Sequence, residues 1–378
     1  IMPSLVGSEM CIRDSIYTDA TLRSLIERAL DHNKDMLIAA ARVKEMAAQK
    51  RISTAALLPD IKGKVTGERE LENHGGDAFK RSDTFEAQFL VSWEVDLWGN
   101  LRWARSASIA EYLQSIEAQR ALQMTIVAEV AQAYYELVAL DTELDIVKQT
   151  LKAREEGVRL ARIRFAGGLT SETSYRQAQV ELARTATLVP DLERKISLKE
   201  NDIAYLAGEY PNKIARSRLL QEFNSPETLP VGLPSTLLER RPDIRQAEQK
   251  LIAANAKVGV AYTNMFPRLA LTGGFGSEST SLSELLKSPY AVMEGALLTP
   301  IFGWGKNRAA LKAKKAAYEA EVHSYEKSVL EAFKETRNAI VNFNKIKEVY
   351  ELRANLERSA KSYMDLAQLQ YINGAVSY

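Results

Sequence analysis

Apolar residues recur at a heptad spacing along two stretches of the chain. Within residues 126–151 they step alternately by four and three residues. An average step of about 3.5 residues is typical of a left-handed supercoil, so it predicts a coiled-coil helix and not a globular core helix. The same step returns within residues 178–206, where the polar Thr185 and Lys199 interrupt it. The two stretches predict an antiparallel helical hairpin with its tip at residues 165–171.

The scarcity of helix breakers predicts two very long helices. Proline is absent between Pro59 and Pro190 and again after Pro300, and glycine is absent from residues 306–372. At about 1.5 Å of rise per residue, uninterrupted stretches of this length predict helices on the order of 100 Å.

Between these helices the pattern changes to a period of two. Residues 85–97 alternate apolar with polar side chains, and Leu90 is the one exception. Such alternation predicts a strand with one apolar and one polar face. A β-hairpin is expected over residues 60–97 and a second one over residues 268–302. The apolar face of the first comprises Phe85, Ala87, Phe89, Val91, Trp93, Val95 and Leu97.

The order of elements is written twice along the chain. Residues 238–267 repeat residues 30–59 without a gap, and the later matches, from residue 99 onward at an offset of 206, stay in phase with one another. Each half reads helix, strand, strand, very long helix and tip, but the second half has no counterpart of residues 172–207, so we expect it to be cut short. The expected segments are a first repeat over 16–208 with its coiled-coil hairpin at 99–207, a linker over 209–235, and a second repeat over 236–378 with its long helix at 305–371.

Residues 1–15 match nothing else in the chain, and they resemble translated adapter sequence. We interpret them as a non-native leader. The chain's one cysteine, Cys11, lies within them, so neither a disulfide framework nor a thiolate metal cluster is expected.

Composition narrows the classes of function. The chain has 378 residues, of which 46% are hydrophobic and 26% charged, with a net charge of +1. This balance gives no support to a nucleic-acid partner. No stretch approaches the ~20 apolar residues of a membrane-spanning helix, whereas the weaker signal of a membrane β-barrel remains compatible with the strands.

Enzymatic functions find no support in the sequence. His32, His74 and His323 lie far apart, and none has a second histidine or cysteine at ligand spacing. No P-loop, nucleophile elbow or dinucleotide fingerprint occurs. We therefore expect no catalytic residue, no metal site and no cofactor.

The apolar strand face requires a cover, which is either protein or lipid. Four strands cannot close a barrel, and open sheet edges are not tolerated in lipid, so the membrane alternative needs several copies of the chain. Trp93, Trp98 and Trp103 suit an interfacial aromatic belt. The long coiled coils favour the membrane over a soluble coiled-coil scaffold, which stays the alternative. The residues then expected to face lipid are Phe85, Phe89, Val91, Trp93 and Val95.

Several motifs follow one another along residues 16–378: "SWEVDLWG", "GLPSTLLERRPDIRQAE", "TPIFGWGKNR" and the paired tips "RFAGGLTS" and "QYINGAVS". They resemble the TolC-like outer-membrane factors of tripartite efflux systems, the NodT-type channel lipoproteins. The resemblance implies a mainly α fold with a membrane β part. It implies a homotrimer with a 12-stranded β-barrel, four strands from each chain, above a periplasmic coiled-coil α-barrel.

The resemblance also implies location, partners and function. Such a channel lies in the outer membrane of a Gram-negative bacterium and extends into the periplasm. It passes drugs, metal ions or other solutes outward, driven by an inner-membrane pump of the RND type and joined to it by a periplasmic adaptor, the membrane fusion protein. An N-terminal lipid anchor is expected of the family, but its cysteine is not identifiable because the residues before Cys11 do not fit a lipoprotein cleavage site.

The two tips are the best candidates for function. The resemblance implies that they border the periplasmic aperture and contact the adaptor. The alternative is simple turn chemistry, in which a glycine supplies a positive φ at the end of a helix. The expected tip residues are Arg164, Phe165, Gly167, Gly168, Leu169, Thr170, Ser171, Tyr371, Asn373, Gly374, Ala375, Val376 and Ser377.

The motif of residues 240–243 is interpreted as a helix start. Pro242 suits a first helical position, and Asp243 is favourable beside the positive helix end. Arg240 and Arg241 are expected to pair with nearby carboxylates, and an anion-binding role is the less favoured alternative.

Overall fold

The computed structural model describes residues 17, 19–72, 75, 80–216, 240–301 and 303–372. Their contacts form two compact units, each assembled from segments that are distant in sequence. The sheet unit falls within residues 39–119 and 235–331, and the helical unit within residues 1–38, 120–234 and 332–378.

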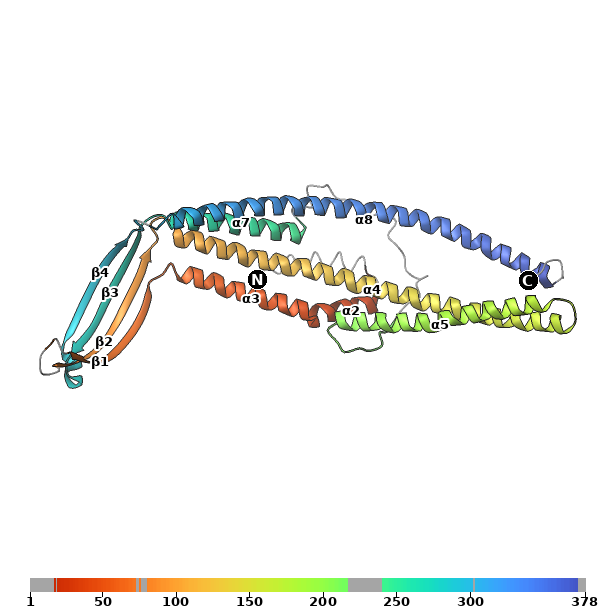
Figure 1. The fold of residues 1–378 in the computed structure, drawn as a ribbon, viewed down its shortest axis with the longest axis horizontal. Helices are drawn as coiled ribbons and strands as arrows, with labels where there is room; N and C mark the ends of the chain where they lie inside the picture. The colour runs from red at the N-terminus through yellow and green to blue at the C-terminus, as the bar shows by residue number, and fades with distance from the viewer. Residues whose placement is uncertain are drawn as a thin grey trace. The chain divides into compact units, whose positions relative to one another are not determined.

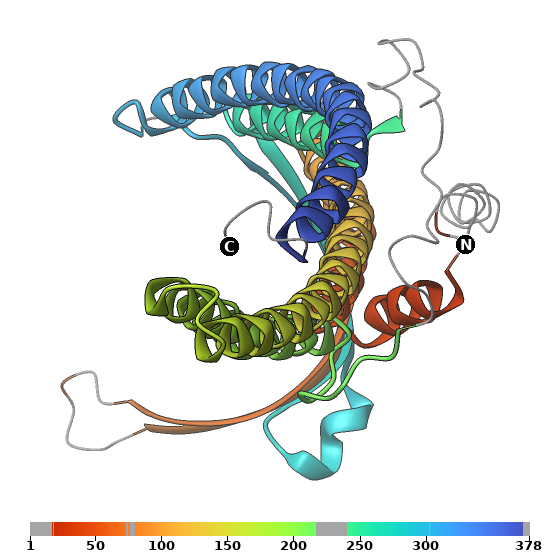
Figure 2. The ribbon, with the colours of Figure 1, turned by 90° about the vertical axis from the view of Figure 1, so that its right-hand side faces the viewer.

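The sheet unit is built on four antiparallel strands in the order β1-β2-β3-β4 (Figure 1). Val95 of β2 lies opposite Leu269 of β3, so the two hairpins form one continuous sheet. The hairpin of β1 and β2 is visibly curved in Figure 2. The bounds are β1 (Asp60–Glu72), β2 (Lys80–Val95), β3 (Arg268–Ser279) and β4 (Pro289–Leu298), with a 3₁₀ turn η2 (Leu282–Lys287) before β4.

The strand register gives the sheet one apolar and one polar face. Phe89 lies opposite Phe275, and Val91 lies opposite Ile61, so apolar side chains of neighbouring strands share a face. On the other face, Gln88 lies opposite Lys64. These two surfaces are called the apolar face and the polar face below. Each strand alternates between them because successive side chains point to opposite sides of a sheet.

Four helical segments complete the sheet unit. The segments belong to α3 (Lys34–Ala55), the start of α4 (Asn100–Ala166), α7 (Pro242–Thr263) and the start of α8 (Lys306–Ile372). Ser53 of α3 shares a hydrogen bond of 2.6 Å with Ser108 of α4, and Lys250 of α7 pairs with Glu321 of α8 at 3.1 Å.

Helix α7 begins as its sequence predicts. Pro242 occupies the first turn, and Arg241 pairs with Asp243 at 2.7 Å within the motif itself. The hydrogen bond from Arg241 holds the pKa of the Asp243 carboxyl below its ordinary value. The motif therefore stabilises its own helix start.

The helical unit is a coiled coil with one short helix packed on it. Helix α5 (Glu172–Leu206) lies along α4, as Figures 1 and 2 both show. The helix continues past Pro190, although this residue has no backbone N–H to donate. The core of the unit consists of the heptad positions, including Ile126, Val130, Leu137, Leu192 and Ile203, together with Leu22, Leu25 and Ile26 of α2 (Ala20–His32).

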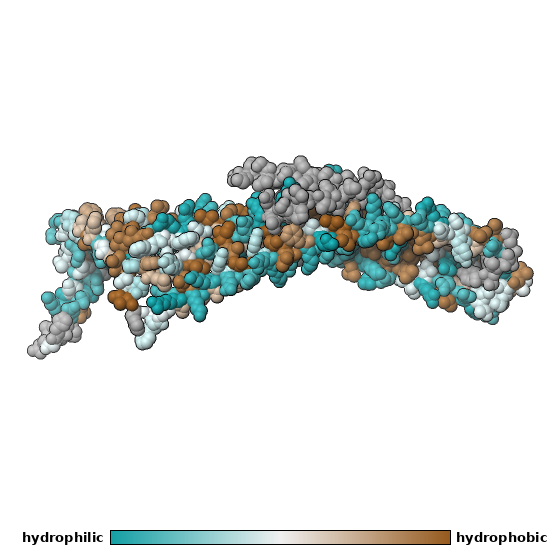
Figure 3. Space-filling model, turned by 90° about the horizontal axis from the view of Figure 1, so that it is seen from above, coloured by the Kyte–Doolittle hydropathy of each residue, from teal (hydrophilic) through white to brown (hydrophobic). Residues whose placement is uncertain are grey.

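The predicted duplication is confirmed, and the corresponding helices of the two halves have equal lengths. Helices α3 and α7 have 22 residues each, and α4 and α8 have 67 each. The second half of α8 leaves apolar side chains such as Ile346 and Leu352 exposed, and brown apolar side chains interrupt the hydrophilic surface in Figure 3. In the described part of the chain, no helix is long and apolar enough to cross a membrane.

Candidate functional site

The tip between α4 and α5 is a tight turn closed by backbone hydrogen bonds. The N–H of Gly167 donates to the carbonyl of Ile163 at 3.0 Å, and that of Leu169 donates to Arg164 at 2.8 Å. Gly168 has a φ of +72°, a conformation in which a side chain is strained. The turn itself therefore requires a glycine at this position, which is compatible both with an adaptor contact and with simple turn chemistry.

An aromatic pair braces the base of this turn. The ring of Phe165, in the last turn of α4, stacks on that of Tyr175 in α5, with centroids 6.1 Å apart and an interplanar angle of 5°. The Tyr175 hydroxyl accepts a hydrogen bond of 2.9 Å from Gln179. Tyr175 and Gln179 were not predicted as site residues, because their spacing of one helical turn is the one signal in the sequence that links them.

Beyond the brace, the turn presents an apolar side chain to solvent. Leu169 is 74% exposed, while Phe165 and Ser171 are also exposed and Arg164 and Thr170 are half-buried. The turn thus combines a fixed backbone with an accessible leucine.

The second tip is described only at its start. Tyr371 belongs to the last turn of α8, which ends at Ile372. The predicted site residues that lie outside the described residues are Asn373, Gly374, Ala375, Val376 and Ser377.

The predicted lipid-facing residues share the apolar face of β2. Phe89 is 66% exposed, Val91 and Trp93 are just over a third exposed, and Phe85 and Val95 are half-buried. The indole of Trp93 donates to the carbonyl of Leu57 at 3.0 Å. A soluble single chain rarely leaves such a face uncovered, so the face needs a partner or a lipid environment.

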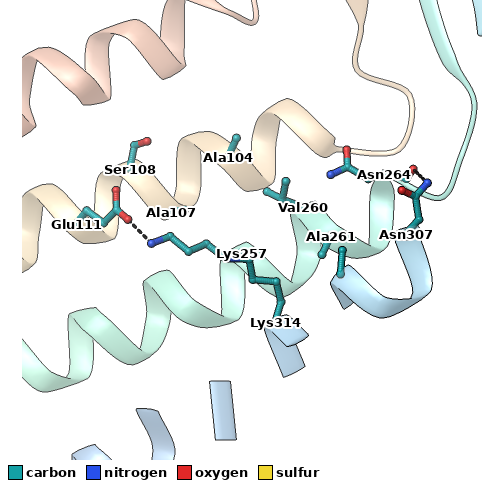
Figure 4. A pocket seen from close by; sticks show the side chains of 11 residues that line it. Ala104, Ala107, Ser108, Glu111, Lys257, Val260, Ala261, Asn264, Asn307 and Lys314 are labelled. Atoms are coloured by element: carbon teal, nitrogen blue, oxygen red, sulfur yellow. Dashed lines mark hydrogen bonds and ion pairs between the residues drawn. The ribbon is translucent and has the colours of Figure 1, made fainter. Parts of the chain in front are cut away.

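A cavity of about 360 Å³ lies where α4, α7 and α8 meet in the sheet unit (Figure 4). Lys257 pairs with Glu111 at 2.6 Å along its wall, and Asn307 donates to the carbonyl of Asn264 at 3.0 Å. The remaining lining is largely alanine, and Ser108 is hydrogen-bonded to Ser53. The cavity holds no pairing of nucleophile and base.

Downstream of α5, Arg216 fixes the chain to the coiled coil. Its guanidinium contacts Asp141 of α4 at 2.7 Å and Glu200 of α5 at 2.6 Å. Two carboxylates compensate one partly buried cation, so this network stabilises the helical unit. Within the described residues, no group of three histidine, cysteine or acidic side chains is placed to hold a metal ion.

A duplicated chain with one exposed apolar sheet face and a long coiled-coil hairpin defines an outer-membrane channel of the TolC-like class. A sequence profile described as "Outer membrane efflux protein" matches residues 25–209 and 233–378. The chain belongs to this family.

Individual relatives agree with the family. Outer membrane protein OprJ of Pseudomonas aeruginosa is 32% identical over 95% of this chain and 77% of that protein. Cation efflux system protein CusC of Escherichia coli K12 is 28% identical over 96% of this chain and 80% of its own length. Toluene efflux pump outer membrane protein TtgI of Pseudomonas putida is 30% identical over 96% of this chain and 78% of that protein.

Solved structures agree as well. The outer-membrane channel OprN superposes with a TM-score of 0.90 at 28% identity, over 95% of this chain and 82% of that one. The Campylobacter jejuni CmeC outer membrane channel also superposes with a TM-score of 0.90 at 28% identity, over 95% of this chain and 78% of that one.

These findings confirm the expected fold class, location, function and partners. The protein is a trimeric outer-membrane channel that extends into the periplasm. It is the exit component of a tripartite efflux system and works with an adaptor and an inner-membrane pump of the RND type. The alternative of a soluble scaffold is excluded.

Proposed function

We propose that the turn between α4 and α5 is the surface that contacts the periplasmic adaptor and borders the periplasmic aperture. The observation that carries this proposal is Leu169, which is 74% exposed at the end of an otherwise buried coiled-coil seam. The proposed surface comprises Arg164, Phe165, Gly167, Gly168, Leu169, Thr170 and Ser171, with Tyr371, Asn373, Gly374, Ala375, Val376 and Ser377 in the second tip.

The proposal extends to the two faces of the sheet. Phe85, Phe89, Val91, Trp93 and Val95 face lipid, and the polar face lines the duct. Alternation of lipid-facing and lumen-facing side chains is general for membrane strands, and the register observed here supports it.

The channel conducts solutes without a cofactor and without catalysing a reaction of its own, because energy enters at the inner membrane. CusC is named for cation efflux and TtgI for toluene efflux. A duct of this kind passes drugs, metal ions or other solutes according to the pump that feeds it. The wall of the cavity in Figure 4 offers an ion pair between Lys257 and Glu111 and several alanines, which suit helix packing rather than chemistry.

Replacement of Leu169 tests the tip. Leu169→Asp should weaken adaptor binding by roughly thirtyfold, since an interface anchor is worth about 2 kcal/mol. Drug susceptibility of cells that depend on this channel should rise accordingly, while trimers form normally on semi-native gels.

The matched control is Leu188→Asp, an exposed leucine in the middle of α5. It should leave adaptor binding and resistance unchanged. Equal resistance in the two variants, with Leu169→Asp present at normal levels in the outer membrane, would remove the tip from the adaptor surface.

A further inference from the structure

A hydrogen bond joins two strands of the sheet that are not neighbours. The hydroxyl of Tyr290 on β4 donates to Oε1 of Glu86 on β2 at 2.7 Å, and Oε1 of Gln88, also on β2, is a second and more distant acceptor at 3.2 Å. Strand β3 lies between β2 and β4. Because neighbouring strands are about 4.8 Å apart, the tyrosine side chain must extend across the whole width of β3 on the polar face.

Gly276 on β3 makes this reach possible. It lies opposite Gln88 on one side and Tyr290 on the other, so no side chain stands between them. A Cβ at this position would lie 2.5 Å from the carbonyl oxygen of Ala87, closer than any real contact. The glycine therefore permits a close approach of β2 and β3 and leaves the space over which the tyrosine extends.

The acceptor carboxylate is fixed from three directions. Its Oε2 accepts hydrogen bonds from Lys64 at 2.9 Å and Thr66 at 3.1 Å, both on β1. Its Oε1 accepts from Gln88 at 2.7 Å as well as from Tyr290. Glu86 is only 18% exposed. The network therefore links β1, β2 and β4, while β3 contributes a glycine.

We propose that Tyr290 is a positioning residue of the channel that sets the local curvature of the sheet, and with it the bore of the outer duct. The proposal rests on the assignment of the polar face to the duct. The face of a sheet that lines a duct is its concave face, and a water-filled duct offers no packed core to resist a change of curvature. A bond that spans three strands must lengthen when the sheet flattens, so the contact between Tyr290 and Glu86 holds one curvature.

Single-channel recording in planar lipid bilayers with KCl, using reconstituted trimers of the full chain, tests this proposal. Tyr290→Phe keeps the ring and removes the donor. Loss of a hydrogen bond to a carboxylate changes an equilibrium constant by roughly tenfold or more. The fraction of time that the channel spends in states whose conductance differs from the main open level should therefore rise about tenfold. Glu86→Ala should do the same. The matched control Glu294→Ala removes another carboxylate of the polar face and should leave these states as rare as in the original channel.

The double variants decide whether one bond is responsible. Tyr290→Phe combined with Glu86→Ala should behave like Glu86→Ala alone, whereas its combination with Glu294→Ala should show the sum of the two effects. Additive effects of Tyr290→Phe and Glu86→Ala would overturn the proposal. Conductance states unchanged in Tyr290→Phe would overturn it too, even if the heat stability of the trimer fell, because the bond would then be merely structural.

A thiol probe separates failure of this proposal from failure of the face assignment. In a chain with Cys11→Ser, a water-soluble charged methanethiosulfonate should alter the conductance of Glu294→Cys. Absence of any change would overturn both the assignment of the polar face to the duct and the role of Tyr290. A clear change, with normal behaviour of Tyr290→Phe, would overturn only the latter.

Discussion

Asp19 illustrates how one buried polar side chain holds the start of the described chain. It is 1% exposed and caps α2, accepting hydrogen bonds from the backbone N–H of Thr21 at 2.7 Å and of Leu22 at 3.2 Å. Its second oxygen accepts from the hydroxyl of the fully buried Tyr134 on α4 at 2.9 Å. A single carboxylate thus caps the N-terminus of α2 and accepts the hydrogen bond of a tyrosine hydroxyl in the core.

Removal of this carboxylate should destabilise the protein. Asp19→Ala loses the cap and leaves the Tyr134 hydroxyl buried without this acceptor, which together cost about 2–4 kcal/mol. Thermal unfolding of detergent-solubilised trimers measures the loss. Asp19→Asn retains one acceptor oxygen for the cap and should lose clearly less. A melting temperature of Asp19→Ala equal to that of the unmodified chain would contradict this account.

The pair of Glu136 and Lys199 predicts a pH dependence. The Nζ of Lys199 lies 2.9 Å from Oε2 of Glu136. Hydrogen bonds from Gln132 and Lys199 lower the pKa of Glu136 from its ordinary 4.5, and the bond to Glu136 raises the pKa of Lys199 above its ordinary 10.5. The carboxylate therefore contributes stability above about pH 4.5 and loses it as the pH falls further, whereas the lysine contributes below about pH 10.5 and loses it as the pH rises further.

Glu136→Gln should remove the acid-side part of this dependence. Both side chains retain contact with water, so the difference should stay below about 1 kcal/mol. Unfolding followed between pH 7 and pH 3 should show a shallower loss in the variant than in the unmodified chain. Identical slopes would mean that the pair contributes nothing to folding.

At the scale of elements, Gly259 determines how closely α4 and α7 approach. A Cβ on Gly259 would lie 2.4 Å from the ring of Trp103. Gly259→Ala gains about 1 kcal/mol of helix propensity but must displace a large ring, which costs about 1–3 kcal/mol. We expect a net loss of stability in thermal unfolding, and a rise in stability when Trp103→Leu is added. A stabilised Gly259→Ala would show that the ring moves freely.

The spacing of apolar residues predicted the helices and strands well, because a coiled-coil helix and a strand each have a characteristic period. The heptad series identified Leu137 and Ile203 as core residues, and both are fully buried. The contact of Trp103 with Gly259, the stack of Phe165 on Tyr175, and the reach of Tyr290 to Glu86 had no signal in the sequence. These contacts depend on how helices cross and on the strand register, which follow from the assembled fold and not from residues nearby in the chain.

For the whole molecule, the two faces of the sheet predict opposite responses to the same substitution. Phe89→Lys places a charge on the apolar face and should cost about 2–4 kcal/mol near the middle of the membrane. Gln88→Lys, one residue away, lies beside the Glu86 carboxylate on the polar face. Heat-modifiable trimers in outer-membrane fractions should be depleted for the first variant and retained for the second. Equal depletion would contradict the face assignment.

The equal lengths of α4 and α8, at 67 residues each, constrain how this protein can change in evolution. Deletion of one heptad from α4 alone would shorten the first hairpin by about 10 Å and leave α8 at its old length. Deletions that are not multiples of seven would also rotate the seam away from its partner. Viable insertions and deletions should therefore occur as whole heptads, matched in α5 and repeated in the second half. A channel assembled from duplicated halves must change its length in both halves at once.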